Sequence, residues 1–398
     1  MPGCDYSPAV RHWAHLYTES ASGFSASLSQ ALPFLLVVLD QIEQRDLPGE
    51  FAFLPYIESN YTPLASSGDR AAGIWQLMPD TAREAGLRIA PDYDGRLDVY
   101  ASTMAALDLL QRYQQEFGDW RLANMAFNAG EYRVKSLVGG DDKSARSAAE
   151  LDRLRLNPRT HAHLAKLLAL ACIVSDPEHF NVELPEPQTD AALAVLDFPA
   201  PVDLRLAAHL ADIDAARLQR LNPGYLHGHM PANGPFRLLL PASHRDSMVS
   251  TLAKLPQSSW RDWHEVVLKQ TQSLNVFASA NNVDPATLAA VNPVDDNAPL
   301  APGTRLLLPG LADRTGSAAQ NVTLIAQATS SAPVIVVHAG DTLWRIARRQ
   351  HVRLDDLLSW NGLDRNATLH LGQPLRLHAS LVTADGQATA SAAAAAAN

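Results

Sequence analysis

The first half of the chain shows a helical pattern of apolar positions. Apolar residues recur three positions apart, as in Met104, Leu107 and Leu110, which places them on one face of a helix. Glycine and proline clusters interrupt this pattern and divide it into roughly six or seven helices. We therefore expect an all-α domain over residues 24–185, preceded by an N-terminal extension over residues 1–23.

The pattern changes after residue 187, where three segments of the chain align with one another. The shift that places Leu274 on Leu343 also places Asn292 on Asn361, without a gap between them. A looser copy precedes these two, with about two residues inserted before its last strand. Each copy has the apolar positions of a strand, two helices and a second strand. The sequence thus predicts three small βααβ modules, listed here in chain order: residues 193–242, 263–310 and 334–378.

Two further segments have the composition of unstructured chain. Residues 311–333 are rich in Ala, Ser, Thr and Gln and indicate a flexible linker, and residues 379–398 are of low complexity and indicate a disordered tail. The 398 residues also exceed the size at which a single core stops growing. The expected fold class is therefore α+β multidomain, with a helical domain followed by βααβ modules.

Charge and histidine spacing exclude two classes of function. The net charge of −10 and the sequence pI of about 5.7 argue against a nucleic-acid partner, because such proteins concentrate Lys and Arg. The 14 histidines show no spacing with Cys or Asp that would bind a metal ion. We expect no metal, no cofactor and no nucleic acid.

The two cysteines and one apolar stretch bear on the location of the protein. Cys172 lies in an apolar run and is expected to be a buried small hydrophobe. Cys4 has the position of an acylated cysteine of an envelope protein, yet residues 1–3 supply no apolar leader, so the leader either was trimmed or was never present. The apolar stretch at residues 31–39 is too short to span a bilayer and predicts a core helix.

The third module resembles a LysM module. The resemblance rests on residues 334–347 (VIVVHAGDTLWRIA), 354–361 (LDDLLSWN) and 371–377 (LGQPLRL). LysM modules bind polymers that contain N-acetylglucosamine, so the resemblance implies peptidoglycan or chitin as ligand, with Gly340, Asp341, Thr342 and Asn361 as glycan-binding residues. The first two modules lack the Gly-Asp-Thr turn and carry Pro-Val-Asp and Thr-Gln-Ser there. Whether these degenerate copies bind glycan or act as spacers stays open.

The helical domain resembles the family 1 lytic transglycosylases. The resemblance rests on five blocks in the family's order: residues 54–61 (LPYIESNY), 66–68 (SSG), 72–79 (AGIWQLMP), 98–103 (DVYAST) and 126–131 (AFNAGE). It implies an all-α lysozyme-like fold of the goose type and an enzyme that cleaves peptidoglycan.

Glu58 is the candidate catalytic residue. It ends an apolar stretch that begins at Phe51, and an apolar environment favours the protonated carboxyl group that a general acid needs. No second carboxylate accompanies it in a comparable motif, and Asp69, Asp92 and Asp94 are expected to be solvated. The resemblance implies a mechanism with one acid. Glu58 protonates the bond between N-acetylmuramic acid and N-acetylglucosamine and then deprotonates the muramyl C6 hydroxyl, which closes a 1,6-anhydro ring without consuming water.

The resemblance also implies a set of substrate-binding residues. Ser67 and Gln76 would bind the N-acetyl and peptide-bearing groups, and Met78 would line a sugar subsite. Tyr61 and Trp75 would offer apolar faces to sugar rings, although core packing is an equal alternative for Trp75. The predicted substrate-binding set is Ser67, Gln76, Met78, Phe127, Tyr61 and Trp75.

Three positions depart from the family pattern. Phe127 stands where the family usually has a tyrosine, and Arg159 and His163 replace a glutamate and a second tyrosine. An arginine close to Glu58 would favour the carboxylate and oppose the first catalytic step. A histidine in the tyrosine position would restore a hydrogen bond and tie activity to pH between about 5 and 8.

The expected function follows from both resemblances. We expect a monomeric peptidoglycan lytic transglycosylase at the periplasmic face of the cell envelope, with Cys4 as a candidate outer-membrane lipid anchor. The alternative is a peptidoglycan-binding LysM protein whose catalysis is weakened or lost because of the replacements at Phe127, Arg159 and His163.

Overall fold

The computed structural model describes two units of the chain. The described residues are 4, 6–67, 70–138, 146–186, 192–292, 294, 298–310, 334–337, 343–350, 352, 354–364, 367 and 373–377. Unit 1 comprises residues 1–324 and unit 2 comprises residues 325–398. The predicted linker at 311–333 and the predicted tail at 379–398 lie outside the described residues.

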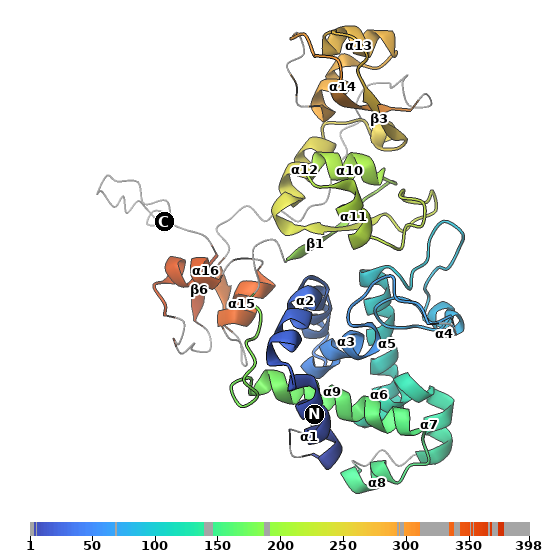
Figure 1. The fold of residues 1–398 in the computed structure, drawn as a ribbon, viewed down its shortest axis with the longest axis vertical. Coiled ribbons are helices and arrows are strands. Elements are labelled where there is room, and N and C mark those ends of the chain that lie inside the picture. Colours follow the sequence, from blue (N-terminus) through green and yellow to red (C-terminus); the bar gives the residue numbers. More distant parts are fainter. Residues whose placement is uncertain are drawn as a thin grey trace, which may run out of the picture. The chain divides into compact units, whose positions relative to one another are not determined.

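A helical domain forms the first half of unit 1 (Figure 1). Its elements are α1 (Pro8–Thr18), α2 (Ala21–Gln44), the 3-10 helix η1 (Gly49–Phe53), α3 (Leu54–Ser59), α4 (Pro79–Glu84), α5 (Val99–Phe117), α6 (Trp120–Ala129), α7 (Glu131–Val138), α8 (Ala148–Asp152) and α9 (Pro158–Ser175).

Local sequence determines where these helices begin and end. The side chains of Asp98, Asp119 and Asn157 accept backbone N–H groups at the starts of α5, α6 and α9, which satisfies donors that have no partner within the helix. Helix α5 ends at Gly118, which has a φ of 68°. Such a left-handed residue is a common helix terminator because glycine adopts it without a steric cost.

One continuous apolar core holds the helical domain together. Helix α2 is long and apolar enough to cross a membrane, but its side chains, among them Leu35, Val38 and Ile42, are buried in this core. The core helix expected at residues 31–39 is therefore confirmed. Val10 and Ala14 of α1 lie in the same core, and α1 packs against α9. The predicted N-terminal extension thus supplies part of the domain's packing.

A disulfide bond corrects the sequence-based view of both cysteines. Cys4 is bonded to Cys172 of α9, 168 residues away. Cys172 is buried, as expected, but it is not a free thiol. A lipid anchor would need the same Cys4 sulfur atom, so the disulfide and a lipid anchor on Cys4 exclude each other. The sequence contains only these two cysteines, and their Cα atoms lie 5.2 Å apart in the fold.

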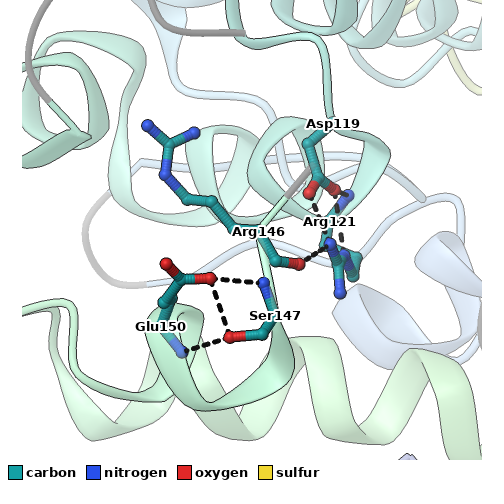
Figure 2. A network of polar contacts seen from close by, with 5 residues as sticks. All are labelled: Asp119, Arg121, Arg146, Ser147 and Glu150. Atoms are coloured by element: carbon teal, nitrogen blue, oxygen red, sulfur yellow. Dashed lines mark hydrogen bonds and ion pairs between the residues drawn. The ribbon is translucent and has the colours of Figure 1, made fainter. Parts of the chain in front are cut away.

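A network of charged and polar groups connects the start of α6 to the start of α8. The carboxylate of Asp119 accepts two hydrogen bonds from the Arg121 side chain, at 3.0 and 2.6 Å, and Arg121 also donates to the backbone carbonyl of Arg146 (Figure 2). Ser147 and Glu150 cap α8 reciprocally, with each side chain bound to the other's backbone N–H. The network therefore connects the starts of two helices that are distant from each other in the sequence.

The three modules have the predicted βααβ architecture. In each, two strands pair antiparallel and two short helices connect them. The elements are β1 (Leu193–Asp197), α10 (Leu204–Leu210), α11 (Ala215–Leu221) and β2 (Arg237–Pro241) in the first module; β3 (Trp263–Val267), α13 (Leu274–Ala280), α14 (Pro285–Val291) and β4 (Arg305–Pro309) in the second; and β5 (Val334–Val336), α15 (Leu343–Arg349), α16 (Leu354–Asn361) and β6 (Pro374–Arg376) in the third. Three elements connect the first two modules: η2 (Ala242–His244), α12 (Arg245–Leu252) and η3 (Gln257–Trp260).

The helices of the second and third modules follow the constant shift found in the sequence. Helices α13 and α15 occupy equivalent residues, and α14 and α16 begin at equivalent residues. One buried asparagine recurs in this frame. Asn292 donates to Leu288 O and Leu307 O and accepts from Leu307 N, and Asn222 does the same in the first module. The repeat therefore preserves a hydrogen bond that attaches the second helix to the last strand.

The first module packs directly against the helical domain within unit 1. The backbone N–H of Asp94 donates to Gly224 O at 3.0 Å, and the Arg237 guanidinium lies 4.4 Å from the centre of the Tyr100 ring. These contacts fix the loop at residues 92–98, which also touches the loop that carries Gly73. The first module is therefore a structural neighbour of the site described next.

Candidate active site

Glu58 lies near the end of the short helix α3 and lines a cleft. The preceding 3-10 helix buries Phe51, Ala52 and Phe53, so α3 begins in the core and runs towards the surface. The side chain of Glu58 is 19% exposed. The cleft is lined by Glu58, Gln76, Leu77, Met78, Thr81, Leu109, Tyr113, Phe127 and Asn128. Four predicted site residues, namely Glu58, Gln76, Met78 and Phe127, thus come together.

The loop at residues 72–78 forms one wall of this cleft. Ser59 Oγ of α3 donates to Ile74 O at 2.9 Å, which ties the loop to the helix of Glu58. Gly73 has a φ of 80°, and a Cβ atom there would lie 1.8 Å from Arg96 O. Only glycine fits this close approach of two backbone segments.

Gln76 is fixed by its own side-chain amide. Its φ of 47° is uncommon for a residue other than glycine. The Nε2 group donates to Ala65 O at 3.1 Å and to Gly73 O at 2.9 Å. Because both amide hydrogens bind backbone carbonyls, the side chain offers its Oε1 atom to a ligand as an acceptor.

The structure places Tyr61 and Trp75 in the core. Trp75 is fully buried and its indole N–H donates to Thr103 Oγ1 at 3.0 Å. Tyr61 is 3% exposed and donates to Ala52 O at 2.6 Å, and burial raises the pKa of Tyr61 well above its ordinary value. Neither ring has a face open to a sugar, which corrects the expectation for Tyr61 and selects core packing as the alternative that holds for Trp75.

Met78 and Phe127 do reach the cleft. Met78 is 42% exposed, and the Phe127 ring packs edge-on against Trp75 with ring centres 6.0 Å apart. Asn128 accepts a hydrogen bond from Thr160 at 2.8 Å, which ties the end of α6 to α9. Ser67 is exposed, donates its backbone N–H to Ala71 O, and is not among the lining residues.

We expected the aspartates near this site to be solvated, but the two that the structure describes are paired with arginines. Asp94 is 9% exposed and binds the Arg96 guanidinium at 3.0 and 2.7 Å. Asp92 pairs with Arg88 at 2.7 Å, and Asp69 lies outside the described residues. Glu58 is the only carboxylate among the described residues that line the cleft.

Arg159 and His163, the two replacements on α9, have different surroundings. Arg159 is exposed and is not among the cleft-lining residues. His163 is 5% exposed, and its Nε2 atom lies 2.9 Å from Glu58 Oε1. Its Nδ1 atom lies 3.3 Å from Asn124 Oδ1. The structure thus brings His163, rather than Arg159, into contact with the candidate acid.

Sequence reasoning did not identify Asn124. It lies on α6, is fully buried and has no motif around it that marks a functional role. Its helical spacing from Phe127 and Asn128 was the one available signal, because residues three and four apart share a helix face.

In the third module, only part of the predicted glycan site is described. Gly340, Asp341 and Thr342 lie outside the described residues. Asn361 is half-buried and donates to Leu357 O at 2.8 Å, as its equivalents Asn222 and Asn292 do to their own helices. Its position in the repeat therefore indicates a structural role rather than contact with a glycan. Trp344 on α15 is 39% exposed.

Comparison with known proteins identifies the segments of the chain. Residues 41–149 match the Transglycosylase SLT domain, residues 192–257 match the LysM-like domain of lytic transglycosylase MltD, and residues 335–377 match the LysM domain. Membrane-bound lytic murein transglycosylase D of Escherichia coli K12 is 30% identical over 386 residues, which cover 94% of this chain and 82% of the relative. The same protein of Escherichia coli O6:H1 gives the same values. The chain belongs to the membrane-bound lytic murein transglycosylase D family.

Membership of the lytic murein transglycosylase D family confirms the resemblance, the fold class and the enzyme class inferred from the sequence. The chain is a lytic transglycosylase with a lysozyme-like SLT domain and LysM modules. A solved structure of an inactive mutant of the lytic transglycosylase Slt from Pseudomonas aeruginosa is 18% identical and covers 37% of this chain and 24% of its own, with a TM-score of 0.28.

Proposed function

We propose that this enzyme cleaves the β-1,4 bond between N-acetylmuramic acid and N-acetylglucosamine in peptidoglycan and leaves a 1,6-anhydro end. The observation that carries the proposal is Glu58, a partly buried carboxyl group in a cleft whose described lining holds no second carboxylate. Most glycosidases use two carboxylates, the second as nucleophile or as base for water. A cleft with a single carboxylate suits a reaction in which the substrate provides its own nucleophile.

The steps balance without water. Glu58 gives its proton to the glycosidic oxygen as the bond from C1 to that oxygen breaks and positive charge develops at C1. The C6 hydroxyl of the same muramyl residue then bonds to C1, and its proton passes to the Glu58 carboxylate. Glu58 ends the cycle protonated, as it began. The products are a glycan with a free N-acetylglucosamine hydroxyl and a glycan with a 1,6-anhydro ring.

We assign the other cleft residues to substrate binding. Gln76 would accept a hydrogen bond from an N-acetyl N–H through Oε1, because its amide hydrogens are already used by the backbone. Met78 and Phe127 would contact the apolar faces of the sugars. Ser67 would bind peptide-bearing groups at the rim of the loop that precedes Gly73.

The modules would keep the enzyme on its polymer. We propose that the third module binds glycan through the turn at residues 340–342, whose sequence keeps the Gly-Asp-Thr pattern. Attachment of a binding module to a catalytic domain raises the local concentration of substrate at the cleft. We also propose that the enzyme acts in the cell envelope on the periplasmic side, which the Cys4–Cys172 disulfide supports, because disulfides persist in oxidising compartments.

Digestion of purified sacculi tests the proposed reaction. Mass spectrometry of the soluble muropeptides should show anhydro ends, which weigh one water less than reducing ends. A Glu58→Gln variant should release none, because an amide cannot donate the proton. Reducing ends from the wild type would instead assign a hydrolytic muramidase. Equal release by wild type and Glu58→Gln would exclude catalysis by Glu58. Absence of release by the wild type itself would favour the alternative of a peptidoglycan-binding protein, for which the lost hydroxyl at Phe127 is the remaining argument.

A further inference from the structure

The ring of His163 connects the candidate acid to a buried amide on another helix. Glu58 on α3, His163 on α9 and Asn124 on α6 follow one another at 2.9 and 3.3 Å. His163 is 5% exposed and Asn124 is fully buried. We propose that Asn124, His163 and Glu58 form a relay in which His163 positions the Glu58 carboxyl and makes transglycosylation depend on the protonation of the imidazole ring. This inference rests on the proposed function of Glu58.

Asn124 determines which ring nitrogen carries hydrogen. Its Oδ1 atom faces His163 Nδ1 and can only accept a hydrogen bond, so we assign the hydrogen of the neutral ring to Nδ1 as part of this proposal. The Nε2 atom of the neutral ring therefore presents its lone pair to Glu58 Oε1. When the ring is protonated, Nε2–H donates to the same oxygen. The contact persists in both states, but its direction reverses.

The direction of this hydrogen bond determines where the acid proton lies. Beside a neutral ring, protonated Glu58 donates through Oε1 to His163, which turns the proton away from any ligand. Beside a protonated ring, Oε1 is an acceptor, and the proton of the acid lies on Oε2, the oxygen that His163 does not occupy. The state that can protonate a glycosidic oxygen thus holds two protons, one on His163 and one on Glu58. Proton donation leaves a carboxylate that the imidazolium stabilises.

Other charged groups on the surrounding helices have their own partners or face solvent. On α6, Arg121 is held by Asp119. On α9, His161 is within hydrogen-bond distance of Leu154 O and Lys166 lies over the Trp13 ring. The remaining acidic and basic side chains on the packed elements are exposed or, for Glu50, half-buried: Arg11, His12 and His15 of α1, Glu50 of η1 and Arg159 of α9. Two half-buried tyrosines, Tyr17 of α1 and Tyr56 of α3, have a pKa raised by burial. Among the described residues, Glu58 is the ionisable side chain in hydrogen-bond contact with the ring.

Variants of the relay should change the pH profile in opposite directions. The rate of anhydro-end release by the wild type should fall as pH rises from acid to neutral values, because the active state needs a proton on both His163 and Glu58 and the imidazolium favours the Glu58 carboxylate. His163→Tyr supplies a hydroxyl that does not ionise in this range, so its profile should be flat there. Asn124→Asp should move the falling limb up by about one pH unit, because a carboxylate stabilises the imidazolium. Asn124→Leu should move it down, because the charged ring loses an acceptor.

The controls separate positioning from folding and from the proposed function itself. At acid pH, where the wild type is most active, His163→Phe should lose activity at least 10-fold while keeping the wild-type melting temperature within a few degrees, and His163→Tyr should recover it. Identical pH profiles for wild type and His163→Tyr would overturn the proposal, and so would full activity of His163→Phe.

A second measurement does not depend on turnover. Nitrogen-15 NMR of the full chain with labelled histidine, with His163 assigned by its loss in His163→Tyr, should show a hydrogen on Nδ1 of the neutral ring. The titration of His163 should move to lower pH in Glu58→Gln, which removes the neighbouring carboxylate. An unmoved titration would overturn the relay. Absence of anhydro ends at every pH, with the NMR result as expected, would overturn the proposed function and leave only the hydrogen-bonded contacts of Asn124, His163 and Glu58 standing.

Discussion

Asn292 binds both backbone polar groups of Leu307, donating to its carbonyl at 2.9 Å and accepting from its N–H at 2.7 Å. Leu307 lies in β4, and its partner across the strand pair is Glu265. The asparagine side chain therefore makes the two hydrogen bonds that a neighbouring strand would make to Leu307, on the edge of β4 that faces α14. Both groups are buried with Asn292, which is 2% exposed.

Asn292→Ala should weaken the second module by about 2 kcal/mol, because it leaves buried backbone groups without partners. Hydrogen exchange of the full chain should become about 30-fold faster in β4, which is the same free energy expressed as a rate. Asn222→Ala is the matched control and should accelerate exchange in β2 while β4 keeps its wild-type rate. Equal exchange in β4 of wild type and Asn292→Ala would contradict this role.

Gly73→Ala should disrupt the catalytic loop. An added Cβ atom would lie 1.8 Å from Arg96 O, and the φ of 80° is unfavourable for alanine. The loop must move, and with it Gln76, so we expect at least a 10-fold loss of anhydro-end release. Gly49→Ala provides the control, because a Cβ atom there meets nothing within 4 Å. Loss of activity in both variants to the same degree would show that the close approach is not the cause.

Asp119 should make the stability of the helical domain depend on acid pH. Burial alone would raise the pKa of Asp119, but hydrogen bonds from the Arg121 side chain and backbone, together with its charge, outweigh burial and lower the pKa. A carboxyl group with a lowered folded pKa binds fewer protons in the folded state than in the unfolded state. Its stabilisation is therefore complete above the unfolded value of about 4 and is lost as pH falls through the folded value.

The variant Asp119→Asn isolates this contribution. At pH 6 it should lower the free energy of unfolding by about 3 kcal/mol, because it leaves Arg121 partly buried without its carboxylate. Urea unfolding between pH 2 and 6 should show the difference between wild type and variant shrinking towards acid pH. A difference that stays constant across this range would exclude the ion pair as its source.

Reduction of the Cys4–Cys172 bond should destabilise the helical domain. The bond joins residues 168 apart, and the loop-closure argument gives about 5 kcal/mol for a loop of this size, as an upper figure. Urea unfolding with and without reductant measures the change in the free energy of unfolding. In the double variant Cys4→Ser with Cys172→Ser, the reductant should leave this free energy unchanged. Intact-mass analysis gives an independent check, since reduction should add 2 hydrogens and alkylation should then label both cysteines. An acyl chain on Cys4 would contradict the disulfide.

The sequence predicted most accurately the features that repeat or that follow local chemistry. The constant shift between the second and third modules placed helices α13 and α15 correctly because the same apolar positions build the same small core twice. Glu58, Gln76, Met78 and Phe127, which belong to three separate blocks of the family resemblance, line one cleft in the structure. The roles assigned to these residues stay predictions.

Other features depend on partners that are distant in the sequence. The indole N–H of Trp75 is satisfied in the core by Thr103, 28 residues later, and nothing near Trp75 in the chain indicates that acceptor. The same holds for the bond between Cys4 and Cys172 and for Asn124, whose significance depends on a histidine 39 residues away. Arg159 and His163 are neighbours on one helix, yet only the second reaches Glu58. Residues four apart share one helix face, so the position along the axis decided between them: Arg159 lies in the exposed first turn of α9, and His163 lies one turn further on.

The register of the strand pairs brings the two ends of each module together. Leu193 pairs with Pro241, Trp263 with Pro309 and Val334 with Arg376. The chain therefore enters and leaves each module at adjacent points. Duplication or deletion of the segment that encodes one module would add or remove that whole module without separating the residues on either side. The number of modules in such a protein can thus change over evolution while the catalytic domain keeps its structure.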